Sequence, residues 1–281
     1  MQITHTPNVI GAHITDVDLA RVTDAEFAGI ESTFNERGVI CIRQQNLSEQ
    51  QLIAFARRFG SVAPHFLKHY THPDHPEILY ISNIQENGKD IGHSDAGSVW
   101  HTDMSYTDKP PRATLLYALE VPTENGKALG NTLFSCAAAA YDSLPDATKQ
   151  RIANLRAIHQ VAGRRAKTGT GQQDQALRRE QPAVIHPVAR THPITRRKCL
   201  YVSKGECEGI EGMAQDEALA LIDELADRTV EERFRYTHHW QPRDLLMWDN
   251  CTVQHLASFD YKWPQHRRLM HRVTVGGSAT F

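Results

Sequence analysis

Residues 245–255, LLMWDNCTVQH, form an apolar run, a polar turn and a histidine, and residues 267–275, RRLMHRVTV, add an arginine pair and a second apolar run. Short apolar runs bounded by turn residues are typical of buried β-strands. These segments predict two C-terminal strands, at 245–248 and 268–275. The same pattern, followed back along the chain, predicts further strands at 39–42, 77–82, 112–121, 199–203 and 233–240.

Helical patterns are concentrated early and in the middle of the chain. Helices are predicted at 24–37, 48–60, 136–155 and 215–228. Ser48 and Gln51 have the spacing of a capping box, in which two side chains satisfy the free amides at a helix start. Short strands with helices on one side suit a β-sandwich or barrel. We expect residues 1–281 to form a single, mainly β domain with flanking helices.

Composition excludes several functional classes. The chain has 281 residues, with 31 basic and 33 acidic side chains. This near balance provides no electrostatic case for binding nucleic acid or an anionic membrane. No apolar run approaches the roughly 18 residues that span a bilayer, and no signal peptide is visible. Five dispersed cysteines favour reduced thiols, so we expect a cytoplasmic protein.

A candidate metal site lies at residues 99–104, VWHTDM, where His101 and Asp103 are two positions apart. On a strand, side chains at this spacing face the same way. One imidazole and one carboxylate suit Fe(II), Mn(II) or Zn(II). The pair alone is weak evidence because it recurs by chance. His255, followed by the arginines of 267–275, strengthens the metal hypothesis.

Several further motifs occur in a fixed order along the chain. They are GAHITDVDL (11–19), LSEQQLIAFARRFG (47–60), WHTDMSY (100–106), AAYDSLP (139–145), HPVARTHP (186–193), WDN (248–250) and RRLMHRVTVGG (267–277). With these motifs the chain resembles the taurine dioxygenase / 2,4-dichlorophenoxyacetate dioxygenase family of Fe(II)- and 2-oxoglutarate-dependent dioxygenases. The resemblance covers nearly the whole sequence. It implies a double-stranded β-helix, or jelly roll, and a dimeric or tetrameric homo-oligomer.

The resemblance also implies the cofactors and their ligands. His101, Asp103 and His255 match a facial triad of two histidines and one carboxylate, which fills one face of an octahedral iron(II). The opposite face remains for 2-oxoglutarate and O₂. Arg268, helped by the Thr132 hydroxyl, matches the group that holds the C5 carboxylate of 2-oxoglutarate.

Four residues are implied to line the rest of the pocket. Trp248 matches a position beside the co-substrate. Arg272 matches the position that binds the anionic group of the prime substrate, with or without a contact to the co-substrate. Arg268 and Arg272 are four apart, so on a strand they share a face. His65 and Met104 are candidate substrate contacts.

The sequence departs from the family pattern at several places, and one is the stretch from His255 to Arg268, which is about two residues longer than in taurine dioxygenase. Residues 129–132 are Leu-Gly-Asn-Thr where the family usually has Gly-Gly-Asp-Thr, and Gly97 stands where taurine dioxygenase has asparagine. Taurine is therefore a doubtful substrate. The histidines at 65, 69, 72 and 75 lie among prolines, which disfavours a second metal site. Residues 163–182 are polar and lack periodicity, and we expect a mobile lid there.

These expectations define a leading function and its alternatives. The leading one is hydroxylation of a small organic anion, such as a carboxylate or sulfonate, with release of succinate and CO₂. The same cofactors also support desaturation or another oxidation in a biosynthetic pathway. Two alternatives belong to other functional classes. They are a zinc-dependent hydrolase on a related barrel and a non-catalytic binding protein.

Overall fold

The computed structural model describes residues 1–161, 163–164, 178 and 180–281. Its largest element is a seven-stranded sheet with the order β1-β2-β3-β17-β7-β19-β4. Neighbouring strands are antiparallel except for the parallel pair β2 and β3. The strands are β1 (Gln2–His5), β2 (Ala12–Thr15), β3 (Val39–Ile42), β4 (Ile78–Ser82), β7 (Ala113–Glu120), β17 (Leu245–Asp249) and β19 (Leu269–Val275).

A second, three-stranded sheet faces the large one. It consists of β16 (Arg235–His238), β10 (Thr132–Cys136) and β18 (Val253–Ala257), all antiparallel. One hydrophobic cluster contains Leu116 and Trp248 of the large sheet together with Phe134 and Val253 of the small sheet. The two sheets therefore pack face to face around a shared apolar core.

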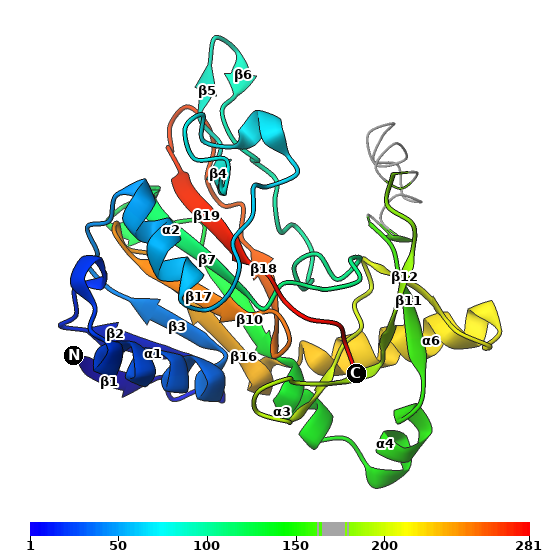
Figure 1. The fold of residues 1–281 in the computed structure, drawn as a ribbon. Helices are drawn as coiled ribbons and strands as arrows, with labels where there is room; N and C mark the ends of the chain where they lie inside the picture. Colours follow the sequence, from blue (N-terminus) through cyan, green and yellow to red (C-terminus); the bar gives the residue numbers. More distant parts are fainter. Residues whose placement is uncertain (162, 165–177, 179) are drawn as a thin grey trace.

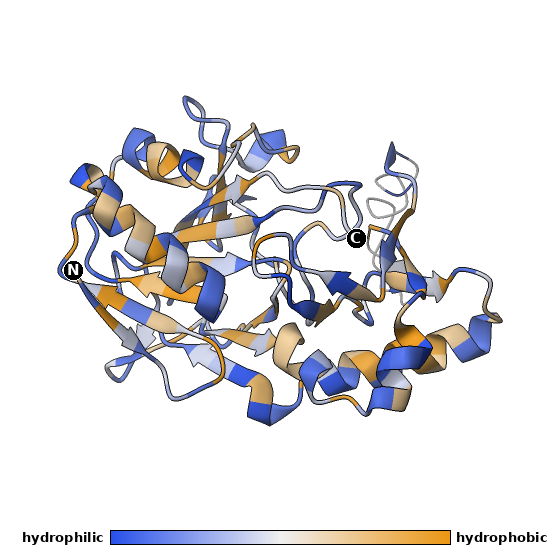
Figure 2. Cartoon of the chain, turned by 60° about the horizontal axis from the view of Figure 1, so that its bottom comes forward, coloured by the Kyte–Doolittle hydropathy of each residue, from blue (hydrophilic) through white to orange (hydrophobic). Residues whose placement is uncertain are grey.

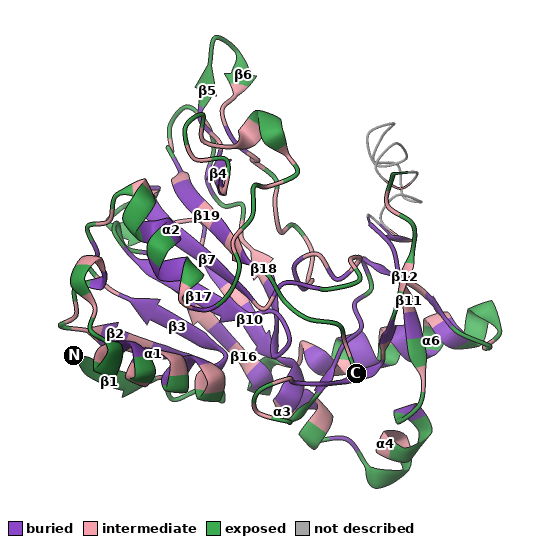
Figure 3. Ribbon diagram, in the orientation of Figure 1, coloured by how far each residue is buried: buried purple, intermediate pink, exposed green. Residues whose placement is uncertain are grey.

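Two helices cover the opposite face of the large sheet (Figure 1). α1 (Asp24–Arg37) and α2 (Glu49–Arg57) both begin with a capping box, and the one on α2 uses Ser48 and Gln51 as predicted. α2 ends at Arg57, three residues before the predicted end. Because the large sheet is covered on both faces, β3 and β17 are buried along their whole length (Figure 3).

A second group of elements lies beside the sheets. It comprises α3 (Ala137–Asp142), α4 (Asp146–Ile152), β11 (Arg156–His159), β12 (Val184–Pro187), β13 (Ala189–Thr191), β14 (Lys198–Leu200), β15 (Cys207–Ile210) and α6 (Gln215–Thr229). β12, β11 and β15 form a sheet, and β13 pairs with β14. α6 presents an apolar face to β15 (Figure 2). The strand predicted at 199–203 is shorter than expected, because β14 ends at Leu200.

The remaining elements are short. They are the hairpins β5 (Gln85–Glu86) with β6 (Lys89–Asp90) and β8 (Thr123–Glu124) with β9 (Lys127–Ala128), and the 3₁₀ turns η1 (Leu19–Arg21), η2 (Lys68–Tyr70) and η4 (Glu232–Phe234). In the described part of the chain no helix combines the length and apolarity that a membrane crossing requires. All five cysteines are buried and unpaired, as expected. Most of the predicted lid at 163–182 lies outside the described residues.

Candidate active site

His101 and His255 are brought together by a single β-bridge. The His101 amide donates to the His255 carbonyl at 3.1 Å, and the His255 amide donates back at 2.9 Å. His255 lies on β18, but His101 lies in a loop that we call the ligand loop (residues 99–107). The strand predicted around His101 and Asp103 is therefore wrong. Beyond this bridge the chain turns, with Met104 in the left-handed region at φ 49°.

Three side-chain atoms nevertheless converge at this bridge. Asp103 Oδ1 lies 3.7 Å from His101 Nε2 and 3.8 Å from His255 Nε2. The ligand atoms of all three residues lie within 4.8 Å of one another. Metal bonds to imidazole nitrogen or carboxylate oxygen are about 2.0–2.2 Å long. These residues could therefore hold one ion between them with only small adjustments.

Neighbouring groups fix which atom of His101 and which atom of Asp103 faces the centre. His101 Nδ1–H donates to the Val99 carbonyl at 2.8 Å, which leaves the lone pair on Nε2. Asp103 Oδ2 accepts from the Thr114 hydroxyl at 2.6 Å and from Trp248 Nε1–H at 3.1 Å. Only Oδ1 remains to face the histidines. Such partners of ligand side chains orient them and tune the ion.

Thr114 is a residue that the sequence analysis missed. It lies on β7, is fully buried, and accepts a hydrogen bond from Asn250 Nδ2–H at 3.1 Å. The available signal was a polar threonine inside the apolar stretch 112–121. A buried polar group of this kind almost always has a hydrogen-bond partner.

The electrostatics favour the metal-binding protonation states of Asp103 and His255. Burial alone would raise the pKa of Asp103, but Arg272 and the two histidines hold it well below its usual value. Burial, together with His101, lowers the pKa of His255 to about 3. A carboxylate and a neutral imidazole are the forms that bind metals. His101 keeps a raised pKa, since its contact with Asp103 outweighs the opposing effect of burial.

Arg272 reaches the same centre from β19. Its Nη2 lies 2.9 Å from Asp103 Oδ1, and its Nε is buried and has no hydrogen-bond partner among the residues that the structure describes. One nitrogen of the guanidinium is therefore free to receive another anion. Its neighbour in sequence, His271, faces the other side of the sheet, where its ring stacks on Tyr80.

Arg268 is a buried cation, and no ion pair is found for it within the described residues. Its side chain is 4% exposed, and its Nε has no hydrogen-bond partner. The Tyr261 ring lies 5.7 Å from the guanidinium carbon, and burial lowers the pKa of Arg268. A buried charge without a counter-charge is costly. Such a site is complementary to an anionic ligand.

Gly130 allows the chain to pass close to Arg268. Its φ is +69°, and a Cβ there would lie 3.2 Å from Arg268 Nε and 2.9 Å from the Tyr261 ring. Thr132 follows at the start of β10, where its hydroxyl accepts a hydrogen bond from Trp240 Nε1–H at 3.1 Å. The Thr132 hydroxyl hydrogen is therefore free to donate. Nothing in the sequence pointed to Trp240.

Trp248 lies beside the candidate metal ligands. Besides donating to Asp103, its ring lies 4.8 Å from the His255 ring and 5.6 Å from that of Phe134. Trp248 thus packs against two of the three candidate ligands. Its expected place beside the co-substrate stays a prediction.

The structure also places the remaining candidates. His65 is half-buried, and its Nδ1 accepts from the Leu67 amide at 3.2 Å. Burial and the nearby Arg272 lower its pKa to about 3, so it is a neutral imidazole with its hydrogen on Nε2. Met104 is half-buried in the turn after Asp103.

One other group of potential ligands occurs among the described residues. It consists of Cys41, His238 and Asp244, all buried. Arg43 forms an ion pair with Asp244, and His238 Nε2 lies 3.1 Å from the same carboxylate oxygen. This oxygen also accepts from the Gln241 amide at 2.9 Å, so it is fully engaged within the protein and we assign no metal there. The histidines at 65, 69, 72 and 75 form no such group in the part of the chain described.

The comparisons with known proteins show the family of the chain. The model of the taurine catabolism dioxygenase TauD, TfdA family matches residues 2–274, and the chain belongs to this family. It is a 2-oxoglutarate-dependent dioxygenase and thus an oxidoreductase.

Two relatives and one solved structure show which kinds of protein the chain is similar to. Pentalenolactone F synthase of Streptomyces arenae is 32% identical over 97% of this chain and 94% of its own length. Alpha-ketoglutarate-dependent 2,4-dichlorophenoxyacetate dioxygenase of Cupriavidus pinatubonensis is 33% identical over 88% of each chain. The crystal structure of AAD-2 in complex with Mn(II) and N-oxalylglycine has a TM-score of 0.82 at 29% identity, covering 98% of both chains.

Proposed function

We propose that this chain oxidises a small organic anion at an iron(II) centre, with 2-oxoglutarate as co-substrate and succinate and CO₂ as products. His101, Asp103 and His255 hold the iron as a facial triad. The convergence of Asp103 Oδ1 with the two Nε2 atoms is the observation that carries the proposal. When bound, the metal and 2-oxoglutarate supply an oxidation by O₂ that is coupled to decarboxylation of the co-substrate.

The protein's own side chains bind and orient the two anions. Arg268 and the Thr132 hydroxyl receive the C5 carboxylate of 2-oxoglutarate, which supplies the counter-charge that buried Arg268 lacks. AAD-2 is complexed with N-oxalylglycine, which differs from 2-oxoglutarate by an NH in place of a CH₂, and with Mn(II). That complex supports a metal and an oxo-diacid in the same pocket of this chain.

The prime substrate binds on the side of Arg272. Its anionic group accepts hydrogen bonds from the free Arg272 Nε–H and from His65 Nε2–H, and Met104 contributes an apolar contact. The name of the 2,4-dichlorophenoxyacetate relative supports a carboxylate substrate. Both hydrogen bonds are charge-assisted or aimed at an anion, which makes them stronger than hydrogen bonds between neutral groups.

A second outcome with the same cofactors is another oxidation in a biosynthetic pathway, including desaturation. The similarity to pentalenolactone F synthase, a synthase by name, favours this alternative. The mass of the product separates them, since hydroxylation adds an oxygen and desaturation removes two hydrogens. A zinc hydrolase is disfavoured, because its reaction needs no 2-oxoglutarate and therefore no buried site at Arg268 that binds a carboxylate.

The architecture fits the same proposal. We propose that the two facing sheets are the halves of a double-stranded β-helix, or jelly roll, and that residues 1–281 are one catalytic domain. A cytoplasmic location, a dimeric or tetrameric homo-oligomer and a lid at 163–182 stay predictions of the sequence.

The test is anaerobic binding of Fe(II) and 2-oxoglutarate, followed by visible absorption. We expect a weak charge-transfer band in the unchanged enzyme and none in His101→Ala. A well-folded, iron-loaded enzyme without the band would refute chelation of the co-substrate.

Titrating the band with 2-oxoglutarate tests the carboxylate site. Arg268→Leu should weaken 2-oxoglutarate binding at least about 30-fold, which corresponds to the loss of about 2 kcal/mol from a charge-assisted contact. Arg267→Leu is the matched control, because Arg267 is exposed and pairs with Glu120. Equal effects of the two substitutions would contradict the assignment of Arg268.

A further inference from the structure

The segment HPVARTHP (residues 186–193) contributes buried polar side chains that the proposed site does not use. His186, Arg190 and His192 are each at most 2% exposed. Burying three such groups is costly unless each is held by specific partners. Two of them, His186 and His192, have hydrogen bonds that lead to the segments carrying the proposed iron ligands.

His192 supports the turn before His255, which we call the Asp249 turn (residues 249–252). His192 Nδ1 accepts from the amides of Ile194 and Thr195 at 3.1 and 3.0 Å, so its hydrogen is on Nε2. Nε2–H donates to Asp249 Oδ2 at 2.8 Å. The other oxygen, Asp249 Oδ1, accepts from the Cys251 and Thr252 amides at 2.7 and 3.1 Å. One imidazole thereby fixes the carboxylate that folds the turn.

The Asp249 turn leads to all three proposed ligands. β18, with His255, continues directly from it. The Thr102 hydroxyl, between His101 and Asp103, lies 3.1 Å from the Asn250 carbonyl and 2.7 Å from that of Val253, the first residue of β18. The Asn250 side-chain amide donates to the Thr114 hydroxyl, which in turn donates to Asp103.

His186 supports the other end of the ligand loop. Its Nε2–H donates to the Thr107 carbonyl at 3.0 Å, and its Nδ1 accepts from the Thr280 hydroxyl at 2.8 Å. Thr107 in turn closes the turn after Asp103, since its amide and hydroxyl both donate to the Met104 carbonyl, at 3.1 and 2.9 Å. His186 therefore anchors the loop where the left-handed Met104 redirects the chain.

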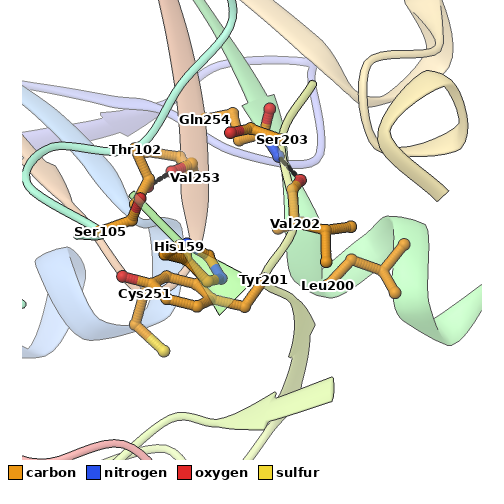
Figure 4. A pocket seen from close by; sticks show the side chains of 11 residues that line it. Thr102, Ser105, His159, Leu200, Tyr201, Val202, Ser203, Cys251, Val253 and Gln254 are labelled. Carbon is orange, nitrogen blue, oxygen red and sulfur yellow. Dashed lines mark hydrogen bonds between the residues drawn. The ribbon is translucent and has the colours of Figure 1, made fainter. Parts of the chain in front are cut away.

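The ligand loop, the Asp249 turn and β18 meet around one small cavity. Figure 4 shows Thr102 and Ser105 of the ligand loop, Val253 of β18 and Tyr201 after β14 around a cavity of about 10 Å³. This is room for about one water molecule. His159 also lines this cavity, so a substitution there disturbs the packing against the ligand loop without removing either histidine anchor.

We propose that His192 and His186 are positioning residues for the iron site, which hold the two ligand-bearing segments in register from outside the site. The inference rests on the proposed function, because it assumes that the triad binds iron. Neither histidine touches substrate or co-substrate. Each acts through the backbone that carries the ligands.

The test compares three buried histidines by their effect on metal binding to the metal-free enzyme. His192→Leu and His186→Leu remove the two anchors, and His192→Gln restores a donor at the position of Nε2. His159→Leu is the matched control. His159 is equally buried and lies 5.1 Å from the His186 ring, but its hydrogen-bond partners, the Cys207 thiol and the Tyr201 backbone, belong neither to the ligand loop nor to the Asp249 turn. Mn(II) affinity and thermal unfolding are measured for each variant.

We expect the two anchor variants to bind Mn(II) about 10-fold more weakly, as partners of ligand residues usually do. His159→Leu should lose stability but keep its affinity, and His192→Gln should recover most of the loss. Affinity losses no larger than that of His159→Leu would overturn the inference. If His192→Leu does not fold, His186→Leu and His192→Gln decide the question.

The same titration distinguishes this inference from the proposed function. If the unchanged enzyme does not bind Mn(II), or if His101→Ala binds it equally well, the metal site itself is wrong. If the unchanged enzyme binds and His101→Ala does not, but the anchor variants bind normally, only the positioning role fails.

Discussion

A single oxygen atom of Asp103 defines how this carboxylate meets the other two ligands. Oδ2 is held by Thr114 and Trp248, so Oδ1 alone faces the histidines and Arg272. A carboxylate held in this way offers one oxygen to an ion and leaves more positions for other ligands. The orientation of the site thus depends on a threonine that lies on a different strand.

Thr114→Val tests this at the residue scale. Valine keeps the shape but removes the donor, so we expect Mn(II) affinity to fall about 10-fold and the free energy of unfolding to fall by about 2 kcal/mol. Thr274→Val is the control. Thr274 pairs with Thr114 across β7 and β19, but its buried hydroxyl has no partner. Its substitution should leave both quantities unchanged or raise stability, and a similar affinity loss in both variants would count against the role of Thr114.

The connection between β9 and β10 shows how an element end shapes a binding site. β9 and β10 are separated by three residues, including left-handed Gly130, and this places the backbone against Arg268 and the Tyr261 ring. The departure from the family pattern at 129–132 leaves Gly130 and Thr132 in place. The Tyr261 ring and the Arg268 side chain therefore occupy the space that the missing side chain of Gly130 leaves.

Gly130→Ala should cost stability and weaken 2-oxoglutarate binding. The left-handed backbone costs alanine about 1 kcal/mol, and the added methyl group displaces Arg268. Gly126→Ala separates the two effects, because Gly126 has φ +76° but nothing within 4 Å of its Cβ position. Both variants should unfold at lower denaturant concentration, and only Gly130→Ala should lose 2-oxoglutarate affinity. Unchanged affinity in Gly130→Ala would argue against close packing at Arg268.

Several buried histidines in different parts of the molecule have pKa values in the folded protein well below the usual value of 6.5. The pKa is about 3 for His159 and about 4 for His238 and His271, and burial is the first cause in each case. His159 is further disfavoured as a cation by His186 and Arg190. Above pH 6.5 these groups are neutral in both folded and unfolded chains, so their contribution to stability is complete there.

Stability should therefore fall as the pH drops below about 6.5. The unfolded chain then takes up protons that the folded chain refuses, which costs up to about 1.4 kcal/mol per pH unit for each histidine. Urea unfolding from pH 7.5 to 5 measures this slope. His159→Leu should have a shallower slope than the unchanged protein. Identical slopes would mean that His159 titrates alike in both states.

Local sequence determined the elements whose signals lie within a few residues. The capping box at Ser48, the helix 215–228 and the strands of 112–121 and 268–275 were all predicted within a few residues. Periodicity and capping depend on neighbours along the chain, so the sequence alone carries them. The family motifs named His101, Asp103, His255 and Arg268, although His101 and Asp103 lie in a loop rather than on the predicted strand.

Only the tertiary structure decided how these residues work together. Thr114, Asn250, Trp240 and the buried histidines of 186–193 come from separate strands and turns, and their partners are distant in sequence. A hydrogen bond such as that between His192 and Asp249 exists only after two sheets have packed and excluded water. Sequence spacing does not encode that proximity, because it is created by burial of the shared apolar core.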